Sequence, residues 1–582
     1  MNNRFWAGGA FMFLCIACSD QSKQASVDSP DIYLNNAYRK VDSVEKKPEY
    51  LDQNWDTENR MMWRYTSQGS RIVPYKWFLA LEQSDSKQLI RAKENLEGYR
   101  FIAAPGDPKW NPDGLPIGFV ADTDNVGVRY FGVTCAACHT GKVAYKGKGA
   151  LVEGGAAHHD FDRFITQIAF SLQQTVDNND KFKRFAALVL GRHSTAAAVA
   201  YLKKQMSKTS IKLGQRVSIN HPPHPNGYGR LDAFGTLFNE LAVFALNEPG
   251  NASLVNAPVS FPVLWDTPQY DVVQWSGSAV NAGVGAYVRN LGEAVGAFGD
   301  LRLQAADNVG RASIKLTHHI NINNLNRLNA LLAKLWSPLW PEQILPVIDQ
   351  QQVERGKPLF AAYCMSCHAN INRNDPERSI KANFIPVKAV GTDSLAASNR
   401  LMPKFKTGIL EGQAESPLEP NTALFGAQSS NAKLVSYVVS GILGDGIKPE
   451  KVLESVSAFK TAVAKNALKV HCDSVGQVPD CQRPASYKAR PLNGIWASAP
   501  YLHNGSVPNL WELLQKPEQR VKQFNVGSWE MDPVKVGFVT RAEAATSLFN
   551  TLLPGNANTG HDYGTALGDA EKWALIEYLK TL

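Results

Sequence analysis

The chain has 582 residues, which is long enough for two or more domains that each bury a hydrophobic core. Its 44% hydrophobic and 20% charged residues are typical of a globular protein and exclude a disordered or fibrous chain. The formal net charge is +8, and no basic block is dense enough to indicate nucleic-acid binding. An acidic redox partner is compatible with this charge, although a solvated surface is the simpler explanation.

The first residues, MNNRFWAGGAFMFLCIACSD, predict an exported protein. Arg4 precedes a short apolar segment over residues 5–17, which is typical of a signal peptide and too short to span a membrane. Cys18 resembles the lipobox cysteine of bacterial lipoproteins, although Cys15 replaces the usual leucine, and ordinary signal-peptide cleavage is the alternative. We therefore expect residues 1–18 to be a signal and the protein to be periplasmic or an outer-membrane lipoprotein held by an N-terminal lipid.

Turn-rich segments divide the rest of the chain. A polar stretch begins an N-terminal extension over residues 19–104, and PGDPKWNPDGLPIGF at 105–119 opens the next region. Helical periodicity follows in HDFDRFITQIAFSLQQTV, with Phe161, Phe164, Ile165, Ile168 and Leu172 in register, and residues 181–208 are also helical in pattern. The segment WSPLWPEQILP at 336–346 marks a boundary. The sequence thus predicts domains at 105–345 and 346–582.

Two Cys-x-x-Cys-His motifs, one in each predicted domain, indicate covalently attached c-type haem. In such a motif the thiols add to the porphyrin vinyl groups and the histidine binds one face of the iron. A zinc site needs four ligands and neither motif has a second pair nearby, while a thioredoxin-type dithiol needs no following histidine. The sequence therefore predicts two haem c groups, bound by Cys135, Cys138 and His139, and by Cys364, Cys367 and His368.

Two segments of the second domain predict a pair of helices. Val353, Gly356, Leu359, Phe360 and Tyr363 share one helical face before the second motif, and apolar residues recur at helical spacing in the C-terminal DAEKWALIEYLKTL. They resemble the crossed helices with which class I cytochrome c domains close over haem. The expected fold class is mainly α, with two cytochrome c-type haem domains in tandem and long loop-rich insertions.

The remaining cysteines outside the signal region are Cys472 and Cys481, in CDSVGQVPDC. No thiol or paired histidine nearby completes a tetrahedral metal site. In an oxidising compartment we expect the two to form a disulfide.

Three stretches resemble the bacterial di-haem cytochrome c peroxidase superfamily. SFPVLWDTPQYDVVQWSGSAVNAGVGAYVRNLGEAVGAF at 260–298 is similar to the peroxidase segment with a tryptophan between the haems. ARPLNGIWASAPYLHNGSVPNLWELL at 489–514 is similar to the segment containing Pro-Tyr-Phe-His-Asp-Gly. GLPIGF and GVTCAACHTG, together with GYGRLDAFG at 227–235, match the branch that contains rubber oxygenase more closely than the short peroxidases. The resemblance covers about residues 100–582 and concerns superfamily and branch rather than reaction.

This resemblance implies catalytic roles near the first haem. Trp275 matches the tryptophan that relays electrons from the second haem to the first, with a packed core aromatic as the alternative. Glu293 lies where the family has a glutamate that acts as acid and base on peroxide, with a surface glutamate as the alternative. Phe298 is the candidate for the phenylalanine of the rubber-oxygenase branch. The peroxidases' arginine after the tryptophan motif is absent, and Ser278 stands nearby.

The resemblance also implies ligands for the second haem. The rubber-oxygenase branch uses a histidine near the C-terminus as the second iron ligand, and His561 is well placed for that role. Met402 and then Met531 are the alternatives. We expect three residues to contact haem propionates: Lys488, Arg490 and His503.

Nothing in the sequence requires a second ligand on the iron bound by His139. Other histidines of that domain, such as the adjacent pair His158 and His159, are alternatives, each more typical of a surface or capping residue. The resemblance favours an open or displaceable face, at which chemistry takes place.

The function expected is a peroxidase-like oxidoreductase. Electrons would enter at the C-terminal haem from a small redox protein (a cytochrome or cupredoxin) or a quinol-linked chain, and pass to a peroxide-reactive N-terminal haem. The alternatives are an oxygen-dependent dioxygenase of the rubber-oxygenase kind and a di-haem cytochrome that only transfers electrons. A calcium ion occurs between the domains of relatives, although no acidic loop of this sequence indicates one.

Overall fold

The computed structural model describes residues 48–281, 285–305, 314–399, 405–418, 421–446 and 484–582. The predicted signal, Met402 and the predicted disulfide between Cys472 and Cys481 lie outside these residues. None of the described helices is both long enough and apolar enough to cross a membrane.

The first haem motif lies between two small sheets. Strand β4 (Arg129–Val133) pairs antiparallel with β2 (Val73–Pro74) and β3 (Phe119–Thr123), and it leads directly into the one-turn helix α5 (Cys135–Cys138). The hairpin of β5 (Thr140–Tyr145) and β6 (Lys148–Glu153) follows, with β1 (Glu49–Tyr50) parallel to β6. The Thr134 hydroxyl caps α5 by accepting a hydrogen bond from the Ala136 amide. Sheets on both sides therefore hold this motif.

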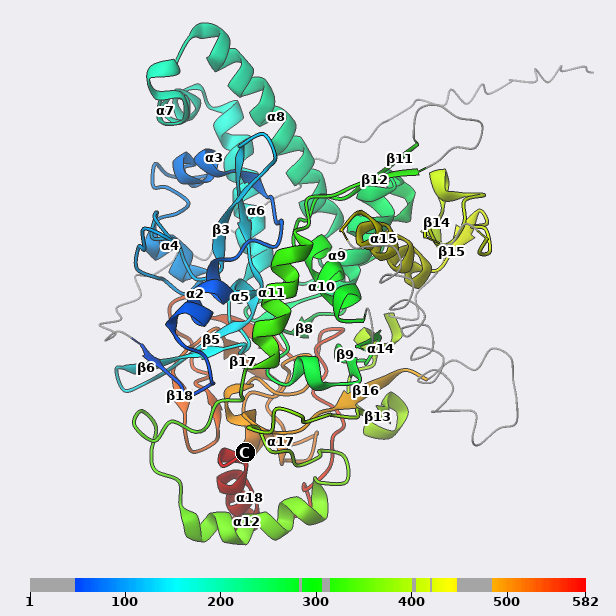
Figure 1. Ribbon diagram of the computed structural model, residues 1–582. Coiled ribbons are helices and arrows are strands. Elements are labelled where there is room, and N and C mark those ends of the chain that lie inside the picture. The colour runs from blue at the N-terminus through cyan, green and yellow to red at the C-terminus, as the bar shows by residue number, and fades with distance from the viewer. Residues whose placement is uncertain (1–47, 282–284, 306–313, 400–404, 419–420, 447–483) are drawn as a thin grey trace, which may run out of the picture.

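Three helices follow the first motif and extend to one end of the molecule (Figure 1): α6 (Phe161–Asp177), α7 (Asn179–Leu190) and α8 (Ala196–Ile219). The apolar register predicted for α6 is confirmed, because all five of its residues are buried. They face an aromatic core in which Phe78 stacks on Phe131 with ring centres 3.7 Å apart and Phe164 packs edge-on.

A third group of helices packs beside the first motif. Helix α10 (Gly285–Gly296) contacts α9 (Ala233–Asn239), α11 (Ile322–Ala333) and α15 (Asn431–Gly446). Leucine and valine side chains from these helices form a separate buried cluster. This packing sets the position of Glu293, which α10 carries.

The helix pair predicted for the second domain is present. Helix α12 (Gln350–Tyr363) ends at Cys364 and crosses α18 (Asp569–Lys580) at the end of the molecule opposite α7 and α8 (Figure 1). The ring centres of Phe360 and Tyr578 are 5.2 Å apart. A Cβ atom at Gly356 would lie 2.0 Å from the Ala574 carbonyl oxygen, so glycine permits the close approach of the two helices.

The largest buried cluster joins residues on both sides of the predicted boundary at 345. It includes Trp265 together with Trp496 and Leu575. The Trp265 indole donates to the Asn493 carbonyl, and Arg378 forms a buried ion pair with Asp266 at 2.6 Å. The two regions thus share a core, while the tandem cytochrome c domains and their boundaries stay predictions.

Short elements connect these parts. The remaining α-helices of the described residues are α2 (Thr57–Tyr65), α3 (Tyr75–Ala80), α4 (Lys93–Gly98), α13 (Val387–Val390), α14 (Leu395–Asn399) and α17 (Leu510–Leu513). The two-stranded antiparallel pairs are β7 (Arg230–Leu231) with β8 (Val259–Ser260), β9 (Val272–Val273) with β10 (Ala279–Val280), β11 (Arg302–Ala305) with β12 (Ile314–Thr317), β13 (Asn383–Pro386) with β16 (Ser486–Ala489), β14 (Phe405–Lys406) with β15 (Gln428–Ser429), β17 (Gln523–Val526) with β20 (Ser547–Asn550), and β18 (Met531–Asp532) with β19 (Gly537–Phe538).

Candidate haem-binding sites

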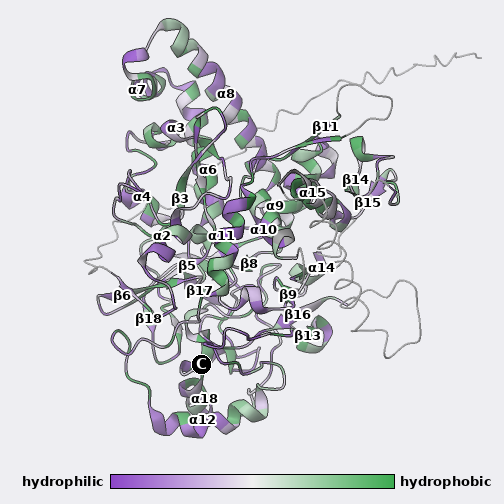
Figure 2. Ribbon diagram, viewed as in Figure 1, coloured by the Kyte–Doolittle hydropathy of each residue, from purple (hydrophilic) through white to green (hydrophobic). Residues whose placement is uncertain are grey.

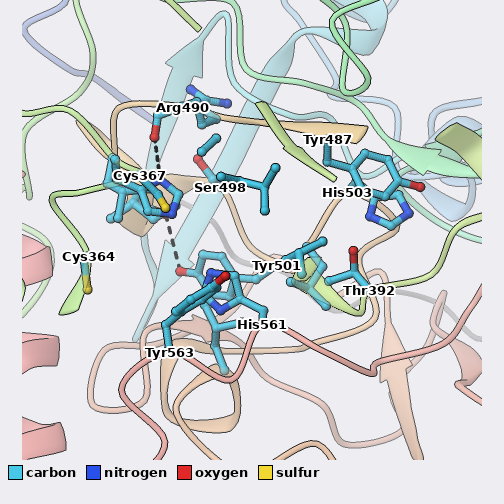
Figure 3. Close-up of a pocket in the computed structure, with 18 of the residues that line it drawn as sticks. Cys364, Cys367, Thr392, Tyr487, Arg490, Ser498, Tyr501, His503, His561 and Tyr563 are labelled. Carbon is cyan, nitrogen blue, oxygen red and sulfur yellow. Dashed lines mark hydrogen bonds between the residues drawn. The ribbon is translucent and has the colours of Figure 1, made fainter. Parts of the chain in front are cut away.

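The second Cys-x-x-Cys-His motif borders a cavity of about 1320 Å³, a volume that includes space open to solvent. Both thiols and His368 line it. His561, from the far end of the sequence, also lines it, and Figure 3 shows this histidine together with both thiols. Leucine side chains form much of the remaining wall: Leu492, Leu502, Leu510, Leu513, Leu514, Leu575 and Leu579. Apolar walls with two thiols and an imidazole at the edge suit a porphyrin attached through its vinyl groups.

His368 and His561 face each other with ring centres 6.3 Å apart. Two imidazoles that bind one metal ion from opposite sides, each at about 2 Å, have ring centres roughly 6 Å apart. Burial lowers the pKa of both rings, that of His561 to about 3, so both are neutral and can donate a lone pair. The geometry therefore fits an iron held between the two histidines.

A hydrogen bond orients the His368 ring, and hydrogen bonds to the backbone hold the loop that carries His561. His368 Nδ1 lies 2.7 Å from the Arg490 carbonyl oxygen, which leaves Nε2 as the nitrogen available to a metal. His561 has a left-handed backbone, with φ of 54°, and its amide donates to the Val390 carbonyl. The Arg520 guanidinium, which is 2% exposed, donates to the carbonyl oxygens of Asn558, Gly560 and His561. Arg520 thus anchors the loop that carries His561.

The three residues expected at the propionates all line this cavity. Burial lowers the pKa of Lys488 to about 7, and its ammonium lies 3.9 Å from the centre of the Tyr270 ring. The His503 ring stacks on Tyr487 at 3.9 Å (Figure 3). Lys488 and Arg490 place cationic side chains in an apolar wall, which suits the anionic propionates of a haem. Met531, the other alternative ligand within the described residues, is buried in β18 and is not part of the cavity lining.

The first motif is deeply enclosed. His139 Nδ1 lies 2.9 Å from the Pro262 carbonyl oxygen, an arrangement equivalent to that of His368 with Arg490. Burial lowers the pKa of His139 to about 4 and raises that of the Cys138 thiol to about 12. The Cys135 thiol donates to Gln68 Oε1 at 2.8 Å. A neutral, oriented imidazole beside two thiols again fits haem attachment. Within the described part of the chain, no second histidine ring faces His139 as His561 faces His368.

Glu293 lies near both thiols of the first motif, and its charge contributes to the raised pKa of each. Its carboxylate accepts a hydrogen bond from Gln274 Nε2 at 3.3 Å, and burial raises its own pKa. Its side chain is accessible to solvent, although many protein atoms surround the carboxyl group. The structure therefore brings Glu293 to the first motif.

Arg289 was missed by the sequence reasoning. It lies one turn before Glu293 on α10, is buried, and acts electrostatically on both Glu293 and Cys135. Its guanidinium donates to Asn281 Oδ1 and Asn329 Oδ1. The spacing of four residues from Glu293 on a helix is the signal that could have revealed it.

Phe298 and the adjacent histidines also lie in this region. The Phe298 ring is 6.5 Å from Phe161, whose ring is 5.7 Å from that of His159. His159 stacks on Phe101, and His158 packs edge-on against Phe538. Both histidines are buried residues rather than surface ones, and burial lowers their pKa values.

Trp275 lies between the two motifs and lines the second cavity. The Trp275 carbonyl accepts a hydrogen bond of 2.8 Å from the Lys488 amide. Lys488 is two residues before Arg490, whose carbonyl contacts His368. The Trp275 indole Nε1 donates to the Ser260 carbonyl at 2.9 Å. Ser260 is two residues before Pro262, whose carbonyl contacts His139. Hydrogen bonds and two short backbone segments thus connect the two histidines through Trp275.

Comparisons with known proteins agree with a haem protein. Residues 486–525, which contain Lys488, Arg490 and His503, match the family described as RoxA-like, cytochrome c-like. The uncharacterized protein y4iJ of Sinorhizobium fredii is 31% identical over 631 aligned positions, which cover 96% of this chain and 95% of that protein. Protein y4iM of the same organism, also uncharacterized, is 42% identical over 118 positions, or 16% of this chain and 27% of that protein.

The chain therefore belongs to the same protein family as y4iJ, and its C-terminal region carries a RoxA-like cytochrome c domain. Such a domain implies covalently bound haem and the class of haem oxidoreductases. The described residues contain no group of three or more histidine, cysteine, aspartate or glutamate side chains that could hold a further metal ion.

Proposed function

We propose that the chain is an exported oxidoreductase with two haem c groups that have different tasks. The observation that carries this proposal is the contrast between the motifs: His368 faces His561 across 6.3 Å, and no described histidine ring pairs with His139 in this way. A haem held by two imidazoles is an electron carrier, because both faces of its iron are taken. The haem at His139 is then the reactive one.

A haem held by Cys135, Cys138 and His139 would supply redox chemistry on peroxide or dioxygen at the first motif. Burial raises the pKa of Glu293, which suits a group that takes up and returns a proton in that chemistry. Gln274 orients its carboxyl group through the 3.3 Å hydrogen bond. The buried Arg289 adds positive charge on the same side of the site. This set of groups favours peroxide as the oxidant.

Trp275 would carry electrons between the haems held at the two motifs. The hydrogen-bonded connection from Arg490 through Trp275 to Pro262 supports this route, because it joins the residues that orient the two proximal histidines. The donor is a small redox protein, a cytochrome or cupredoxin, or a quinol-linked chain, and it delivers electrons to the second haem.

Oxygen-dependent cleavage or oxidation of an organic substrate is the second candidate function. The match of residues 486–525 to the RoxA-like family favours it, and Phe298, whose ring lies 6.5 Å from that of Phe161, is the candidate pocket residue. In this case the enzyme needs no electron donor.

Electron paramagnetic resonance of the purified protein tests the division of tasks. We expect one low-spin ferric haem that ignores added cyanide and one haem whose signal changes with cyanide or peroxide. Two low-spin haems that ignore both additions in both redox states would leave an electron carrier.

Turnover assays then separate the two enzymatic candidates. Peroxide reduction with a small electron donor supports the first, and oxygen consumption without a donor supports the second. In the Glu293→Gln variant we expect peroxide turnover to fall by about a hundredfold or more while the haem spectra stay unchanged. Unchanged peroxide turnover would remove Glu293 from the mechanism.

A further inference from the structure

Helices α7 and α8 form a hairpin that projects from the body of the molecule at the end opposite α12 and α18 (Figure 1). Its base is packed: Phe182, Phe185 and Ala186 are buried, and Trp77 meets Phe185 edge-on. From Ala187 to Ala197 the chain is exposed or half-exposed, which includes the connection between the helices. We call residues 187–211 the outer hairpin.

The hairpin carries a large share of the positive charge of the protein. Residues 179–219 contain nine lysines and arginines and a single acidic residue, Asp180, so this segment has the same net charge as the whole chain, +8. The rest of the sequence is therefore neutral overall. A concentration of charge in one projecting element creates a local field that the total charge of the protein does not suggest.

Ion pairs neutralise the base of the hairpin. Lys181 and Arg184 pair with Glu82, and Lys212 pairs with Asp300. In the outer hairpin the situation differs, because no carboxylate of the described residues lies within ion-pairing distance of its four cations: Arg192, Lys203, Lys204 and Lys208. The outer hairpin thus presents uncompensated positive charge to its surroundings.

Large apolar side chains accompany these cations. Leu188 is 65% exposed, Tyr201 66% and Ile211 59%. Tyr201 and Ile211 share the outward face of α8 with Lys204 and Lys208, since these positions are three or four residues apart. The inward face of α8 packs against the protein, because its apolar residues Leu202, Met206 and Leu213 are buried. Figure 2 shows this mixture of hydrophobic and hydrophilic residues along α7 and α8.

We propose that the outer hairpin docks on an anionic phospholipid surface. Lysine and arginine beside exposed leucine, isoleucine and tyrosine are the composition with which helices lie in the interface of a membrane. The cations pair with lipid phosphates, and Leu188, Tyr201 and Ile211 enter the headgroup region. A projecting, convex element fits a deformable surface, whereas a protein partner must offer a matching acidic groove. The hairpin lies away from both haem motifs, so this role is independent of the oxidoreductase function.

Vesicle flotation tests the proposal. The haem-loaded protein is mixed with vesicles of phosphatidylcholine alone, or of phosphatidylcholine with about a third phosphatidylglycerol, at low and high salt. We expect binding to the anionic vesicles to exceed binding to the neutral ones, and the excess to disappear at high salt. A lipid or apolar leader elsewhere in the chain binds neutral and anionic vesicles alike. The additional binding to anionic vesicles therefore measures the contribution of the hairpin.

The triple variant Arg192→Glu, Lys204→Glu and Lys208→Glu should lose at least roughly tenfold of its affinity for the anionic vesicles. The matched control, Arg355→Glu, Lys357→Glu and Lys535→Glu, makes the same change of net charge at exposed positions outside the hairpin and should bind as the parent does. The double variant Leu188→Ser and Tyr201→Ser should bind more weakly while keeping its salt dependence.

Three results would overturn the proposal. The first is equal binding to neutral and anionic vesicles. The second is an equal loss of binding in the triple variant and its control. The third is the absence of vesicle binding, which would leave an acidic protein as the partner of the outer hairpin.

Discussion

At the second haem motif, the position of one ring depends on a small set of loop contacts. His561 follows Gly560 and adopts a left-handed backbone that costs about 1 kcal/mol for a residue with a side chain. The guanidinium of Arg520 offsets this cost by donating to three carbonyl groups of the loop, those of Asn558, Gly560 and His561. Contacts within the protein therefore hold His561 opposite His368.

If His368 and His561 both bind the second haem, as proposed, replacing His561 by alanine should convert that haem from low-spin to high-spin, because one imidazole ligand would be lost. Electron paramagnetic resonance and the visible spectrum of the oxidised protein measure this change. Met531→Leu is the matched control, since Met531 lies in the core outside the cavity lining and should leave the spin state unaltered. The ligand assignment is wrong if the control alters the spectrum and His561→Ala does not.

Asp162 introduces a pH dependence into the stability of the protein. Burial raises its pKa from 3.8 to about 7, with the nearby Asp160 adding to the shift. A carboxyl group whose folded pKa is raised contributes stability below its unfolded pKa, and this contribution is lost as the pH rises through the folded value.

Asp162→Asn should therefore stabilise the protein at pH 8 by roughly 4 kcal/mol, from about 1.4 kcal/mol for each pKa unit. The gain should be small near pH 4, grow up to about pH 7 and then stay constant. Thermal unfolding across this range measures it. Asp177→Asn, at the exposed end of the same helix, is the control. A gain for Asp162→Asn that does not vary with pH would contradict the explanation.

At the scale of elements, the crossing of α12 and α18 depends on Gly356. Gly356→Ala should destabilise the protein by about 1–3 kcal/mol or more, because the new methyl group meets the Ala574 carbonyl at 2.0 Å and the helices must separate. Gly214→Ala is a matched control in α8, where a Cβ has no neighbour within 4 Å. It should stabilise the protein by about 1 kcal/mol through helix propensity alone. Denaturation midpoints of both variants give the comparison, and equal shifts would refute the role of the close approach.

At the scale of the whole molecule, Trp275 connects the two haem motifs. Trp275→Phe keeps an aromatic ring and removes the Nε1–H donor to the Ser260 carbonyl. We expect slower electron transfer between the haems, with both haem spectra retained, as measured by rapid-mixing absorbance after reduction of the second haem. Trp511→Phe is the control, because Trp511 stacks on Trp573 outside this connection. Equal rates in the two variants would make Trp275 a packing residue only.

Much of the chemistry was readable from local sequence. The two Cys-x-x-Cys-His motifs need only five consecutive residues each, and periodicity was sufficient for α6 and for the pair α12 and α18, because helix faces are set by spacing along the chain. The relation of Arg289 to Glu293 was also readable, since four residues separate them on one helix. These features are local, so neighbours in the sequence are neighbours in space.

The arrangement of the site depended on packing between distant segments. Only the tertiary structure brings His561 opposite His368, aims the Pro262 and Arg490 carbonyls at the two proximal histidines, and connects them through Trp275. It also separates the hairpin cations into a paired base and an unpaired tip. The sequence by itself determined the haem attachment chemistry and the helices, because both follow from local bonding. The shared core of the two halves decides which loop residues meet across a cavity. Its contacts join residues that are hundreds of positions apart in the sequence.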